Sequence, residues 1–209
     1  MSEYLKKREE FVMQQIKSKD YVTILLVIAN IAVYIFCTIQ GNVLYNMGSL
    51  SVVDIINRQE YYRILTSMFL HANPQHIWGN MIFLAALGDM LERSIGHGRF
   101  FAIYMLAGIG GNLLSMGHEL ATGQFCSTIG ASGAVFGLIG ALLLLICKNN
   151  GTYGQVSFRR MIFAIVYLFY SGIQSETTNN MAHLGGFITG FAVMAVFYCI
   201  TRRRYKRIR

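Results

Sequence analysis

The segment from Tyr21 to Ile39 contains no charged residue, and this feature constrains the fold of the chain more than any other. A helix of this length is comparable to the hydrocarbon core of a bilayer, which is roughly 30 Å thick. The rest of the chain agrees, because 54% of its 209 residues are hydrophobic, only 13% are charged and one is proline. A soluble domain of this size normally carries more charge. The sequence therefore predicts a protein that spans the membrane.

Six apolar segments predict an all-α polytopic membrane protein, a bundle of six transmembrane helices. These segments are Tyr21–Ile39, His76–Leu91, Phe100–Met116, Gly133–Cys147, Met161–Ile173 and Met181–Ile200. The fourth segment is short, because a helix over its residues would rise only about 22 Å. If Lys148 marks one face of the membrane, this central helix begins below the other face.

Basic residues predict which side of the membrane each loop occupies. Of the 18 Lys and Arg residues, all but Arg58 and Arg63 lie in the N-terminal segment, after the second and fourth apolar segments, or in the C-terminal tail. By the positive-inside rule both termini are cytoplasmic, which requires an even number of spans. We therefore expect a cytoplasmic segment over residues 1–20, a six-helix membrane domain over 21–201 and a basic cytoplasmic tail over 202–209.

The net charge of +8 requires no nucleic-acid partner. Anionic lipid headgroups attract Lys and Arg on the cytoplasmic side, so the basic tail predicts contact with the lipid bilayer rather than with nucleic acid. The four cysteines show neither a CxxC pair nor the spacing of metal ligands. They are Cys37, Cys126, Cys147 and Cys199. We expect no metal and no organic cofactor.

Four polar residues of the apolar segments are predicted to share one depth in the membrane. Measured along a helix from the next cytoplasmic charge, Ser132 is about 24 Å away and His183 about 28 Å away. His76 and Asn80 share one helix face and lie about 26 Å and 20 Å from Arg93. An ionisable side chain inside a span is costly, so it marks a functional site by default. Three different apolar segments thus place polar side chains at one depth in the membrane.

Glycines in the fourth and sixth segments predict that these two helices approach each other closely. They are Gly133, Gly137 and Gly140 in the fourth segment and Gly185, Gly186 and Gly190 in the sixth. Such proximity would bring Ser132 within hydrogen-bonding reach of His183, and the free N–H groups at the start of the fourth helix would stabilise an oxyanion. Taken alone, this serine fits helix packing better than catalysis; the shared depth reverses that interpretation. No obvious aspartate completes a triad, which favours a Ser-His dyad.

The polar and glycine motifs of the chain, and their order, resemble those of the rhomboid family of intramembrane serine proteases. The resemblance covers nearly all of the chain after the N-terminal segment. The matching motifs are Tyr62-Arg63, the run from Leu65 to His71, His76-x-x-x-Asn80, Gly130-x-Ser132-Gly133 and Ala182-His183-x-x-Gly186-x-x-x-Gly190. A lone GxSG is a weak signal, whereas all of these motifs in order are highly specific.

The resemblance implies a role for each matched residue. Ser132 would be the nucleophile and His183 the general base. His76 and Asn80 would form the oxyanion hole together with the Ser132 backbone N–H. The supporting residues would be Gly130 and Gly133 in the nucleophile turn, Gly186 and Gly190 between the sixth and fourth helices, and Glu92 as a structural acid. Phe136 stands where many members have Tyr, and its ring would still pack against the His183 imidazole.

The expected function is a serine endopeptidase that cleaves transmembrane segments of other membrane proteins near the outer face. A helix with all backbone groups paired cannot present a carbonyl, so the substrate segment must unwind there. The resemblance also implies a gate on the fifth segment, at Phe169 and Tyr170. We expect a bacterial plasma membrane location, with the oligomeric state left open.

Two alternatives remain from the sequence. A rhomboid-like protein without protease activity would recruit membrane clients, but such relatives lack the dyad that Ser132 and His183 provide. A transporter would use His76 and His183 as a proton or ion path. Against the transporter, no internal repeat is visible.

Overall fold

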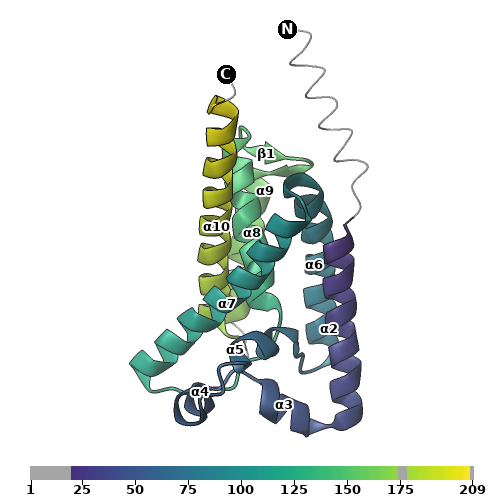
Figure 1. Cartoon of the computed structure of the whole chain (residues 1–209), viewed down its shortest axis with the longest axis vertical. Helices are drawn as coiled ribbons and strands as arrows, with labels where there is room; N and C mark the ends of the chain where they lie inside the picture. Colours follow the sequence, from purple (N-terminus) through teal and green to yellow (C-terminus); the bar gives the residue numbers. More distant parts are fainter. Residues whose placement is uncertain (1–19, 174–177, 208–209) are drawn as a thin grey trace.

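The computed structural model describes residues 20–173 and 178–207, which fold into helices and one short hairpin (Figure 1). The elements are α2 (Tyr21–Gln40), α3 (Asn42–Gly48), α4 (Val52–Arg58), α5 (Arg63–Thr66), the 3₁₀ helix η1 (Ser67–Phe69), α6 (Pro74–Ile95), α7 (His97–Thr122), α8 (Ser132–Lys148), β1 (Thr152–Tyr153), β2 (Val156–Ser157), α9 (Phe158–Ile173) and α10 (Asn180–Arg207). Each of the six predicted apolar segments lies within one helix. The predicted helical membrane class is therefore confirmed.

Three of the described helices are long and apolar enough to cross a membrane by themselves. They are α2, α7 and the part of α10 from Asn180 to Thr201. The count of six spans stays a prediction. The predicted cytoplasmic segment over residues 1–20 lies outside the described residues except for Asp20, as do the side chains of the predicted tail.

Two helices extend six or seven residues beyond their predicted C-terminal ends. α7 continues past Met116 to Thr122 and stops at Gly123, whose φ of 71° provides a left-handed C-cap. Its last turns carry the polar side chains of His118 and Glu119, which an apolar pattern does not detect. α10 continues through the basic residues to Arg207, because Arg and Lys are good helix formers.

The connecting elements divide the bundle into two ends (Figure 1). The segments α3, α4, α5 and η1 cover one end, which we call the loop end. The β1–β2 hairpin and the C-terminal part of α10 lie at the other, the hairpin end. α8 begins towards the loop end and is enclosed by its neighbours, so 12 of its 17 residues are buried.

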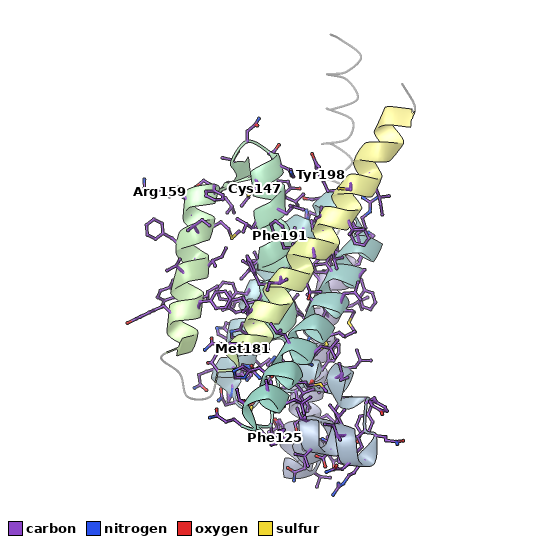
Figure 2. The ribbon with its side chains drawn as sticks, turned by 90° about the vertical axis from the view of Figure 1, so that its left-hand side faces the viewer. Phe125, Cys147, Arg159, Met181, Phe191 and Tyr198 are labelled. Carbon is purple, nitrogen blue, oxygen red and sulfur yellow. The ribbon has the colours of Figure 1, made fainter. Side chains whose placement is uncertain are left out.

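The glycine faces of α8 and α10 meet directly. A Cβ atom at Gly186 would overlap the carbonyl of Gly133, and one at Gly190 would overlap the carbonyl of Gly137. Figure 2 shows α10 crossing in front of α8, with Met181 towards the loop end and Tyr198 towards the hairpin end. This close approach places the start of α10, which carries His183, beside the start of α8, which carries Ser132.

α9 is packed more loosely than α8. It lies to the side of α8 and α10 in Figure 2, with Arg159 at its start. Phe163, Val166, Tyr167 and Tyr170 are each more than 60% exposed, which suits side chains that face lipid.

Candidate active site

Ser132 is the first residue of α8 and follows a tight turn. Gly130 has a φ of 129°, a conformation that L side chains rarely adopt, so glycine is required there. The first helical hydrogen bond runs from the N–H of Val135 to the carbonyl of Ala131, at 3.0 Å. The N–H groups of the first turn, including that of Ser132, have no intrahelical acceptor and carry partial positive charge.

The start of α10 is fixed by Asn179. Its side-chain oxygen accepts a hydrogen bond from the N–H of Ala182 (3.0 Å), and its carbonyl accepts one from the N–H of His183 (3.2 Å). Its amide donates to the hydroxyls of Ser115 on α7 (2.6 Å) and Thr128 in the loop before α8 (2.8 Å). One side chain thus holds the helix that carries His183 against both neighbours.

The structure brings Ser132 and His183 together. The Ser132 Oγ and the His183 Nε2 are 2.9 Å apart, so an unprotonated Nε2 accepts a hydrogen bond from the hydroxyl. Phe136 stacks on the imidazole, with ring centroids 4.1 Å apart and an interplanar angle of 12°. The Phe169 ring meets the Phe136 ring edge-on, with ring centroids 5.1 Å apart. Among the residues that the structure describes, the buried Nδ1 of His183 has no hydrogen-bond partner.

His76 and Asn80 line the same cavity as Ser132. The cavity has a volume of about 240 Å³, and its lining includes His76, Asn80 and Ser132. A Cβ at Gly130 would be 2.8 Å from the Nε2 of His76, so the imidazole lies directly against the nucleophile turn. The Asn80 amide donates to the carbonyl of His76 at 3.0 Å. Two side chains that can donate hydrogen bonds thus line the same cavity as Ser132.

Glu92 lies far from this cavity, at the N-terminus of α2. Its carboxylate accepts hydrogen bonds from the N–H groups of Val22 (2.8 Å) and Thr23 (2.7 Å) and from the Thr23 hydroxyl (2.6 Å). It is 1% exposed. Glu92 therefore joins α6 to α2, which is a structural role. Within the described part of the chain, no three metal-ligating side chains cluster.

Several residues hold the site in place in a role that was not predicted for them from the sequence. Asn179 had a detectable signal, because an Asn just before an apolar run is typical of a helix N-cap. Ser115, Asn112 and Glu119 had none, because a small or polar residue in an apolar segment does not reveal which loop it contacts. Glu119 is only 2% exposed and accepts hydrogen bonds from Ser115 and Cys126.

The fold and the site together define an integral membrane protein whose helical bundle holds a serine and a histidine in hydrogen-bonding contact. The family model described as the Rhomboid domain matches residues 58–199, which is more than half of the chain. The chain belongs to the rhomboid family.

Curated relatives agree with this assignment. RHOMBOID-like protein 1 of Arabidopsis thaliana is 37% identical over 74% of the chain and 39% of that protein. RHOMBOID-like protein 7 of the same plant is 32% identical over 73% of the chain and 48% of that protein. Rhomboid protease GluP of Bacillus subtilis is 33% identical over 68% of the chain and 27% of that protein. The matched region spans less than half of each of these three relatives.

Proposed function

We propose that the protein is an intramembrane serine endopeptidase that cleaves transmembrane segments of other membrane proteins. The observation that carries the proposal is the 2.9 Å distance between the Ser132 Oγ and the His183 Nε2. Serine attack needs an adjacent base at this range. Family membership and the name of the Bacillus subtilis relative support the same chemistry.

The proposed reaction proceeds through an acyl-enzyme. His183 accepts the Ser132 proton while the Oγ bonds to the scissile carbonyl carbon. The resulting oxyanion is stabilised by the Ser132 N–H and by the side chains of His76 and Asn80. His183 then returns the proton to the leaving nitrogen, and the C–N bond breaks. Water, deprotonated by His183, attacks the ester and releases the new carboxyl end together with the free serine.

The stacked ring of Phe136 supports this role for His183. An imidazole that accepts a proton becomes a cation, and the face of an aromatic ring attracts a cation. Gly130, Gly186 and Gly190 support it through geometry, because a Cβ at Gly130 would clash with the His76 ring and one at Gly186 or Gly190 would overlap the α8 backbone. At Gly133 a Cβ would only come into contact with the Ala182 carbonyl, at 3.4 Å.

We also propose the orientation of the bundle. The loop end would face outward, with both termini cytoplasmic, six spans in total and the short α8 starting below the outer surface. The concentration of Lys and Arg outside the loop end supports this orientation. Cleavage would then occur near the outer face, in a substrate segment that unwinds, and the membrane would be a bacterial plasma membrane.

The test uses the full chain, purified in detergent, and a model substrate with one transmembrane segment. Wild type should cleave it, whereas Ser132→Ala and His183→Ala should each lose measurable cleavage. His118→Ala is the matched control, because His118 lies on α7 away from the dyad. Cleavage that survives Ser132→Ala would remove the assignment, and proton flux in liposomes without cleavage would favour a transporter.

A further inference from the structure

We propose that Asn112 on α7 is a positioning residue for the nucleophile turn, and that it acts through Ser67 on Gly130. The inference rests on the proposed protease function. Asn112 itself does not line the cavity that holds the site. Its effect would therefore be indirect, through the elements of the loop end.

Asn112 joins α7 to the loop end. Its side-chain amide donates one hydrogen bond to the carbonyl of Ile64 in α5, at 2.8 Å, and one to the hydroxyl of Ser67 in η1, at 2.9 Å. Asn112 is 7% exposed and Ser67 is 1% exposed, so water does not replace these contacts readily. Both N–H groups of one amide are used to fix two consecutive short helices.

Ser67 passes this constraint to the nucleophile turn through its main chain. Its carbonyl accepts a hydrogen bond from the N–H of Gly130, at 2.9 Å. Two residues earlier, Thr128 exchanges a pair of backbone hydrogen bonds with Leu50, at 2.9 and 3.0 Å. The turn before Ser132 is therefore held by three main-chain contacts, and all three come from the loop end.

The hydrogen bond to Ser67 fixes the orientation of the peptide before Gly130. Glycine populates many backbone conformations, so the peptide before Gly130 could rotate if its N–H lost its acceptor. That rotation would move the turn against which His76 packs, and with it the N–H of Ser132. A displacement of about 1 Å in a catalytic group can cost on the order of 100-fold in rate.

A second contact keeps η1 in place when Asn112 is changed. Met68 fills a notch on α7 where a Cβ at Gly108 would overlap its side chain. Removing the Asn112 amide should therefore loosen the orientation of Ser67 without releasing η1 from α7. This separation makes Asn112 a suitable site for a test.

The test compares Asn112→Leu with Asn30→Leu in the full chain in detergent. Both asparagines are buried, and the same near-isosteric change is made in each, but Asn30 contacts Leu26 and Tyr104 rather than the loop end. The readouts are kcat and KM for the model substrate and the rate of labelling by a small fluorophosphonate, which needs the oxyanion hole but no docked helix. We expect Asn112→Leu to lower kcat and the labelling rate by roughly 10- to 100-fold with KM unchanged. Asn30→Leu should leave both rates within about twofold of wild type.

Ser67→Ala provides a second variant in case Asn112→Leu does not fold. It removes the hydroxyl that Asn112 binds but keeps the carbonyl that binds Gly130. We expect a smaller loss, and the double variant should lose no more than Asn112→Leu alone, because both changes interrupt one path.

The outcomes separate this inference from the proposed function. A wild-type protein that neither cleaves nor reacts with the fluorophosphonate refutes the proposed function. An active wild type with an equally active Asn112→Leu refutes the inference alone. So does an equal loss in Asn30→Leu, or a double variant whose loss is the product of the two single losses.

Discussion

Replacing Phe136 by Leu should slow the chemical step without weakening substrate binding. The Phe136 ring lies parallel to the His183 imidazole at 4.1 Å, and its side chain is 6% exposed. A ring face stabilises a nearby cation by about 0.5 kcal/mol at an exposed site and about 2 kcal/mol when desolvated. The proposed mechanism places a positive charge on His183 only after proton transfer. Leu keeps an apolar side chain but removes this attraction from the transition state.

The buried position of the pair supports the upper part of that range, about 1–2 kcal/mol. Since 1.36 kcal/mol corresponds to a tenfold change in rate, kcat should fall roughly 5- to 30-fold. The assay is cleavage of the single-span substrate, with thermal unfolding used to compare only folded protein. Phe100→Leu is the control, because it makes the same change at a buried ring near the start of α7, away from His183. An unchanged kcat in Phe136→Leu, or an equal fall in Phe100→Leu, would contradict this reasoning.

Three further predictions concern stability. Burial first, and then the charge on His76, lower the pKa of His71 from its ordinary 6.5 to about 4, so folding excludes a proton that the unfolded chain binds. The free energy of unfolding should be fully retained above pH 6.5 and should fall by about 3 kcal/mol as the pH drops to 4. In His71→Gln, the midpoint of unfolding should depend less on pH over this range. Glu92→Ala leaves buried N–H groups of α2 without acceptors, so it should cost about 3 kcal/mol in denaturant unfolding; an unchanged midpoint would count against that role. Gly190→Ala should cost about 1–3 kcal/mol because its Cβ meets the α8 backbone, whereas Gly117→Ala, in open space, should be close to neutral.

The sequence alone was sufficient to predict the long helices and the shared depth of the residues of the candidate site. A residue's height in a membrane helix follows from its distance to the next charge, so the shared level of Ser132 and His183 could be counted along the chain. Glycine spacing then predicted that their helices touch. The contact of 2.9 Å between the two side chains agrees with both arguments.

The loop end could not be predicted in the same way. The helices α3, α4 and α5 are four to seven residues long, too short for a periodic pattern to be distinguished from a loop. The contact between Asn112 and Ser67 joins residues 45 positions apart, and the one between Ser67 and Gly130 uses only backbone atoms. Backbone hydrogen bonds leave no trace in residue identity, so only coordinates reveal them.

The pairing of Leu50 with Thr128 has a consequence for mutational drift. Any residue except proline supplies the same N–H and C=O, so the two backbone bonds themselves do not depend on residue identity. The buried Leu50 side chain and the Thr128 hydroxyl, which binds Asn179, still restrict which residues fit. Proline at either position would remove one bond of the pair. A substitution that keeps these side-chain contacts would therefore leave the main-chain support of the turn before Ser132 intact.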